Sequence, residues 1–249
     1  MTAWRLEWLR LVRTRRLVAL AGVYVFFGFV GPLTARYLGE IIDRFGGSQM
    51  TVVVPDPVPT DGIVQFASNA AQIGVLVAVA VAAGALVVDA LPEMSVFLRT
   101  RMPSAGALLL PRLVVTAAAV GTAYLLGAAI AWYETAALIG GVPAGGMIGG
   151  AVLAVLYLCF AVALVAAIGA RLRSVLGTVG TTVVVLLAMP LLGLVEAVGR
   201  FLPSHLVGAQ VGLVTGESLG DYLPAVAITL AVGAALVASA IRATGRREL

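Results

Sequence analysis

The hydrophobic positions of this chain fall in runs of about twenty residues, separated by shorter polar segments. A helix of about twenty residues rises roughly 30 Å, which is the thickness of the hydrocarbon core of a bilayer. Inside lipid the backbone must satisfy its own hydrogen bonds, so these runs are helices rather than open strands. The pattern predicts an all-α membrane protein with six transmembrane helices. The expected spans are residues 17–35, 71–90, 107–131, 147–170, 175–195 and 223–241.

Two of the connections are longer than a link between spans needs, namely residues 36–70 and 196–222. The first contains PDPVPTDG (55–62), whose three prolines predict an extended stretch. Before it, residues 37–45 either extend the first helix or lie along the membrane interface. The second connection is too short for two more spans, and short re-entrant or interfacial helices are expected in it, before the last span.

The composition supports this interpretation. Of the 249 residues 61% are hydrophobic and only 11% are charged, whereas soluble domains carry roughly 25% charged residues. The single cysteine, Cys159, excludes an intrachain disulfide. The Arg-rich start leads into a run long enough to span, which favours a first span over a cleavable signal peptide. We expect one transmembrane domain over residues 1–249.

The charges predict the orientation. All sixteen basic residues are arginine, and only Arg36, Arg44 and Arg200 lie in the links that also hold most of the acids. The other arginines lie before the first span, after the last, and in the links between spans two and three and spans four and five. By the positive-inside rule both termini and the segment 92–103 face the cytoplasm.

Residues 3–16 form an amphipathic helix in this interpretation. Its apolar side carries Trp4, Trp8, Leu11 and Val12, and its polar side carries Glu7, Arg10, Arg13 and Thr14. We expect an interfacial elbow helix with Trp4 and Trp8 at headgroup depth and Arg10 and Arg13 toward anionic lipid. The alternative is a juxtamembrane arginine cluster that only sets the topology.

The segment PEMSVFLRTRMP (92–103) is longer than a turn requires and holds apolar side chains beside charges. Val96, Phe97 and Leu98 precede Arg99 and Arg101. This combination predicts a cytoplasmic helix that docks a soluble partner. In the alternative it is a solvated loop whose apolar residues return to the interface.

Several motifs are missing from the sequence. It has no GxxxxGK[ST] loop for a nucleotide phosphate and no GxSxG elbow for a nucleophile. One histidine, His205, and one cysteine leave no basis for a metal cluster. We therefore expect no catalytic residue, metal or cofactor on this chain, and no nucleic-acid partner.

Three residues near the outer ends of spans are candidates for a pathway or outer gate. Glu134 and Glu196 stand at the ends of the third and fifth spans, where ionisable groups can line a pathway or snorkel to the interface. Pro190 is expected to kink the fifth span.

With these features the chain resembles permease subunits of type-2 ATP-binding cassette transporters. Their first cytoplasmic loop reads approximately as an acid, Gly-Thr, a Leu-rich stretch and Pro-Val-Ser-Arg. DALPEMSVFLRTRMPSAGALLLPR (89–112) matches in Asp89, Glu93, Ser95, Leu98 and Pro103-Ser104, and departs in Met94 and in Ala105-Gly106. The tail IRATGRREL (241–249), the opening LEWLRLVRTRRL (6–17) and the segment 59–74 are also similar to members of this family.

The resemblance implies an exporter of a hydrophobic or amphipathic substrate in the plasma membrane of a prokaryote. A separate nucleotide-binding ATPase subunit would carry ATP and Mg and dock on residues 92–103. The coupling residues would be Asp89, Glu93, Ser95, Val96, Phe97, Leu98, Arg99, Arg101 and Pro103. A second permease copy or a related permease would complete a dimer within membrane lipids, with the second and fifth spans near its axis.

Other classes stay open at this point. A secondary transporter needs charged or broken helices near the midplane, and these spans hold almost no ions at their centres. A membrane-embedded enzyme needs convergent acids, His or Cys, and the sequence supplies scattered ones. A channel or assembly subunit without a motor is a further alternative.

Overall fold

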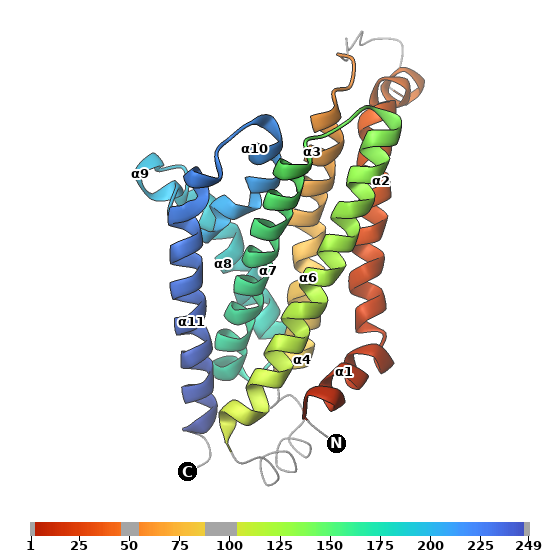
Figure 1. The fold of residues 1–249 in the computed structure, drawn as a ribbon. Coiled ribbons are helices and arrows are strands. Elements are labelled where there is room, and N and C mark those ends of the chain that lie inside the picture. Colours follow the sequence, from red (N-terminus) through yellow and green to blue (C-terminus); the bar gives the residue numbers. More distant parts are fainter. Residues whose placement is uncertain (1–2, 46–54, 88–103, 247–249) are drawn as a thin grey trace.

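The computed structural model describes residues 3–45, 55–87 and 104–246, and every regular element in these ranges is a helix. Figure 1 shows a bundle of long helices running between two ends. Six helical stretches are long and apolar enough to cross a membrane. They are Arg16–Ile42, Pro59–Leu86, Ala105–Leu138, Ala144–Leu172, Val175–Leu192 and Leu219–Gly245. An all-helical fold with six apolar helices of spanning length is therefore confirmed.

The chain begins with α1 (Ala3–Arg13) and α2 (Arg16–Phe45), which are followed by α3 (Pro59–Asn69), the π-helical turn η1 (Ala70–Gly74) and α4 (Val75–Leu86). The long helices α6 (Ala105–Leu138), α7 (Ala144–Leu172) and α8 (Val175–Leu192) come next. Four short helices, α9 (Glu196–Gly199), η3 (Pro203–Val207), α10 (Ala209–Thr215) and η4 (Leu219–Tyr222), lead into α11 (Leu223–Gly245).

The expected outer loop 36–70 is largely helical, which corrects the sequence-based boundary. Residues 36–45 continue α2, so this segment extends the first helix. The second span begins at Pro59, because proline at the first helical position has no N–H to lose there. The carboxylate of Asp61 accepts a hydrogen bond from the backbone N–H of Val58 at 2.9 Å and caps that turn. Only residues 55–58 of the proline-rich stretch precede the helix.

Close backbone contacts hold α2 against α6. A Cβ on Gly127 would lie 2.5 Å from the carbonyl oxygen of Tyr24, and a Cβ on Gly28 would lie 2.6 Å from the carbonyl oxygen of Gly127. Only glycine allows the two helices to approach so closely. The side chain of Tyr24 is fully buried in this seam, where its ring meets that of Tyr124 edge-on at 5.5 Å.

Short helices are present in 196–222, as expected before the last span, and α10 packs on the start of α7. A Cβ on Gly150 would lie 2.3 Å from the Cα of Gln210, and one on Gly146 would lie 2.4 Å from the carbonyl oxygen of Leu213. The segment thus belongs to the bundle and does not simply connect its last two long helices.

Both ends of the described chain lie at one end of the bundle, where α1 crosses beneath the long helices (Figure 1). The start of α6 and the end of α11 lie at this end too, with Arg112 and Arg242. The expected coupling helix 92–103 lies outside the described residues.

Candidate functional site

An apolar groove of about 640 Å³ lies between the second and fifth long helical stretches. One part of the groove is lined by Ala71 and Gln72 of η1, Val75 and Leu76 of α4 and Tyr157 of α7. The rest is lined by Val183, Leu186, Leu187 and Pro190 of α8 and by Ser204, Val207 and Gly208. Its volume falls within the range of roughly 300–1,000 Å³ that small-molecule pockets occupy. The groove is thus large enough for a ligand.

The π-helical turn η1 forms part of the groove wall. Single π-turns inside α-helices occur frequently at functional sites. Gly74, the last residue of this turn, lies against Tyr24, because a Cβ at this position would come within 2.6 Å of the tyrosine ring. Tyr24 therefore contacts the same turn whose residues Ala71 and Gln72 face the groove.

Pro190, a predicted pathway residue, lines this groove. It lies in the last turn of α8, which ends at Leu192 rather than at residue 195. Proline lacks an N–H and its ring crowds the preceding turn, so Pro190 disturbs the helical hydrogen bonds at the end of α8 and not in its middle. Leu186 and Leu187 lie one turn earlier and line the groove with it.

The polar groups of the groove are few. Among its lining residues, Gln72, Tyr157 and Ser204 carry polar side chains and the rest are apolar or glycine. A site of this kind binds a ligand mainly by removing apolar surface from water, while a few polar groups fix its orientation. The groove therefore suits a hydrophobic or amphipathic molecule.

A buried polar chain links three helices behind this region, and the sequence analysis missed it. The hydroxyl of Tyr124 on α6 donates to Oε1 of Gln210 on α10. Nε2 of Gln210 donates to Sδ of Met147 on α7 at 3.3 Å. Gln210 is fully buried. The sequence signal that could have indicated this site is a polar amide residue within an apolar stretch that contains glycines.

One residue from each predicted side of α1 faces the bundle. Leu11 is 4% exposed and faces the bundle, whereas Trp4 and Trp8 are each 49% exposed. Arg13 is exposed as expected, but Glu7 of the polar side faces α6. The reason is Arg112, which is buried and requires a carboxylate partner.

An ion pair provides that partner. Nε of Arg112 lies 2.8 Å from Oε1 of Glu7, and an NH group of Arg10 lies 3.7 Å from the other carboxylate oxygen. The sequence alone placed both Glu7 and Arg10 on the polar side of this helix. The contact joins α1 to the first turns of α6.

Of the remaining predicted residues, none whose side chain the structure describes lines the groove. Glu134 is partly buried on α6 and is not among the groove residues. Glu196 is the first residue of α9, and its side chain is not described. All of the predicted coupling residues, Asp89, Glu93, Ser95, Val96, Phe97, Leu98, Arg99, Arg101 and Pro103, lie outside the described residues.

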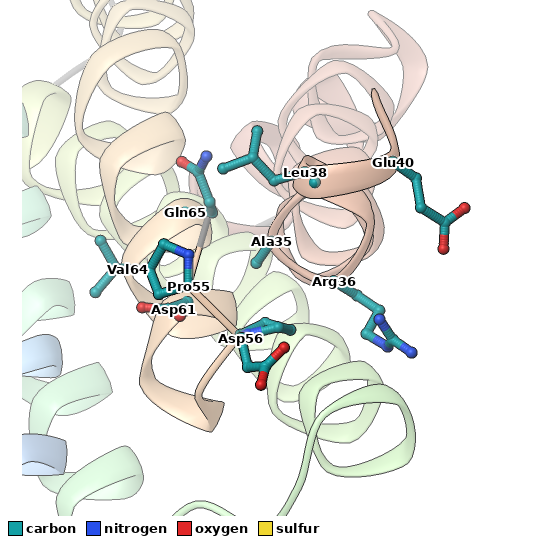
Figure 2. Close-up of a pocket in the computed structure, with 11 residues that line it drawn as sticks. Ala35, Arg36, Leu38, Glu40, Pro55, Asp56, Asp61, Val64 and Gln65 are labelled. Carbon is teal, nitrogen blue, oxygen red and sulfur yellow. The ribbon is translucent and has the colours of Figure 1, made fainter. Parts of the chain in front are cut away.

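A second pocket of about 500 Å³ lies at the opposite end of the bundle from α1, between the end of α2 and the start of α3. Figure 2 shows the side chains of Arg36 and Glu40 pointing away from Pro55 and Asp61. The Asp61 carboxylate already accepts the Val58 N–H. This pocket therefore offers a less convergent site than the groove.

The rest of the described chain supplies no candidate metal site. In residues 3–45, 55–87 and 104–246 no group of three His, Cys, Asp or Glu side chains could hold a metal ion. His205 stacks on Tyr222 with ring centroids 4.8 Å apart. Comparisons with family models, with curated proteins and with solved structures gave no match.

Proposed function

We propose that this chain is the permease subunit of a type-2 ATP-binding cassette exporter in the plasma membrane of a prokaryote, with both termini in the cytoplasm. The observation that carries the proposal is the apolar groove between the second and fifth long helical stretches of a six-helix chain. The resemblance places these two spans near the axis of a permease dimer, where the substrate passes.

The groove also supports the kind of substrate. Its wall is almost entirely apolar, and its polar groups are limited to Gln72, Tyr157 and Ser204. A hydrophobic or amphipathic molecule such as a lipid, a peptide or a drug gains most from such a site. A charged solute would lose its hydration with no compensating partner.

The motor is a separate chain in this proposal. The sequence has no phosphate-binding loop of its own, so an ATPase subunit with bound ATP and Mg docks on residues 92–103. Phe97 and Leu98 are the apolar contacts, and charges such as Arg101 at the rim contribute more to partner choice than to affinity. The helix α1, with Trp4 and Trp8 exposed, acts as the elbow in the cytoplasmic interface.

Purification from the native membrane tests the partner directly. A stoichiometric nucleotide-binding subunit is expected with the wild-type chain, and substrate should stimulate its ATP hydrolysis. Phe97→Ala combined with Arg101→Glu should abolish this stimulation and leave membrane insertion intact.

A matched control has the same two changes at the other end of the bundle. Phe201→Ala with Arg200→Glu removes a cation–π contact of 4.8 Å and should leave coupling unchanged. Absence of an ATPase subunit, or undiminished stimulation in the Phe97/Arg101 variant, contradicts the proposal.

A further inference from the structure

Three arginines surround one carboxylate where α1, α2, α4 and α6 meet. Arg112 and Arg10 contact Glu7 at 2.8 and 3.7 Å. The guanidinium of Arg16 lies over Gly84 of α4, where a Cβ would come within 3.2 Å of it. The three arginines and Glu7 line one small hollow.

The positive charges of this cluster outnumber the negative charges among the residues that line the hollow. Arg10, Arg16 and Arg112 carry three positive charges, and Glu7 carries one negative charge, which leaves an excess of two. No other acid is among the residues that line the hollow. Desolvated positive charges repel one another, and a bound anion reduces this repulsion. The excess of positive charge beside a partly buried guanidinium therefore attracts an anion.

The geometry places the anion at the mouth of the hollow. Its volume of about 10 Å³ has room for roughly one water molecule. Arg112 is 4% exposed, while the side chain of Arg10 is 33% exposed. Arg10 and Arg16 can therefore reach an anion outside, and Arg112 adds its charge from behind.

The position of the arginine cluster in the bundle indicates which kind of anion binds there. The cluster lies at the end of an apolar bundle, directly beside α1 with its exposed Trp4 and Trp8 (Figure 1). Indole side chains of this kind prefer the headgroup level of a bilayer. A phosphate held at this level belongs to a lipid, and guanidinium groups bind phosphate oxygens through parallel hydrogen bonds.

We propose that Arg10, Arg16 and Arg112 form a binding site for the phosphate of an anionic phospholipid. Glu7 positions Arg112 and Arg10 around it. The site does not depend on the transport function proposed above, because it requires only that this end of the bundle meets lipid headgroups.

Lipid retention in detergent tests the site. The full chain is reconstituted with phosphatidylglycerol and phosphatidylcholine of identical acyl chains, extracted, and examined by native mass spectrometry. Wild type is expected to retain phosphatidylglycerol selectively. Arg16→Gln and Arg10→Gln should each weaken this retention about five-fold, as expected for one arginine near a lipid surface.

Arg242→Gln is the matched control, because it removes the same charge from an exposed position at the same end of the bundle, in the last turn of α11. It should change retention less than two-fold. Competition with inorganic phosphate and with glycerol 3-phosphate separates a headgroup site from a site for a free anion. Thermal unfolding in phosphatidylcholine alone identifies any variant that fails to fold.

Three results would overturn the proposal. The first is equal retention of the two lipids by the wild-type chain, which is also the outcome if acids outside the described residues neutralise the cluster. The second is an equal loss in Arg242→Gln and Arg16→Gln. The third is displacement of the lipid by inorganic phosphate at similar concentrations.

Discussion

Nε of Arg112 on α6 donates a hydrogen bond of 2.8 Å to Oε1 of Glu7 on α1, from 105 residues further along the chain. The arginine is 4% exposed and the carboxylate 16% exposed, so the pair is almost removed from solvent. This contact is a polar link between the N-terminal helix and the start of the third long helical stretch, and it turns Glu7 toward the bundle.

Glu7→Gln is therefore expected to lower the free energy of unfolding by about 3 kcal/mol, because it leaves a buried guanidinium without its counter-charge. Thermal or denaturant unfolding in a defined detergent measures this. Replacing both residues together, with Glu7→Met and Arg112→Met, should cost less than Glu7→Met or Arg112→Met alone. A double variant whose loss equals the sum of the single losses would contradict the pairing.

Gly127→Ala is expected to force α2 and α6 apart. Its new methyl group would lie 2.5 Å from the Tyr24 carbonyl oxygen, and overpacking of this kind costs about 1–3 kcal/mol. Gly22→Ala on α2 is the control, because no atom lies within 4 Å of its added methyl group. That change should be neutral or stabilising by up to about 1 kcal/mol. Unfolding midpoints measured side by side decide, and equal effects would rule out the close helix contact.

The Tyr124–Gln210 hydrogen bond is expected to hold α10 on the bundle. Gln210→Met preserves length but leaves the Tyr124 hydroxyl without its acceptor, which should cost about 1–3 kcal/mol. Tyr124→Phe should cost a similar amount. The double variant should lose less stability than the two single variants lose in sum, because both buried polar groups are then removed together. Hydrogen exchange of the α10 amides reports the local effect, and unchanged protection in both single variants would contradict it.

The number of helices long and apolar enough to span could be predicted from the sequence, since each apolar run is long enough to cross a bilayer on its own. The ends of the helices could not. α2 continues to Phe45 because nothing in residues 36–45 breaks a helix, and the second span starts at Pro59 because proline is tolerated in the first turn. Hydropathy identifies the part of a helix that fits in lipid and not the part that extends beyond it.

The candidate site was less accessible from the sequence. Pro190 was identified as a helix breaker and does line the groove. Most of the other wall residues are ordinary Val, Leu and Ala side chains, whose convergence depends on how α4, α7 and α8 pack. Likewise Glu7 and Arg112 are far apart in sequence, and the helical periodicity of α1 placed Glu7 on its polar side without indicating the partner.

Leu187→Trp is expected to fill part of the apolar groove and compete with its ligand. Leu187 lines the groove and Leu191, one turn later on α8, does not, although both are 67% exposed. Leu191→Trp is thus a control with the same change of volume on the same helix.

If the groove binds the substrate, Leu187→Trp should weaken the apparent affinity about ten-fold, which corresponds to roughly 1.4 kcal/mol. Leu191→Trp should stay within two-fold of wild type. A panel of fluorescent lipids and drugs, titrated against the reconstituted chain, gives the affinities. Equal weakening in both variants would mean that the indole acts through the lipid-facing side of α8, and unchanged binding in both would place the substrate elsewhere in the bundle.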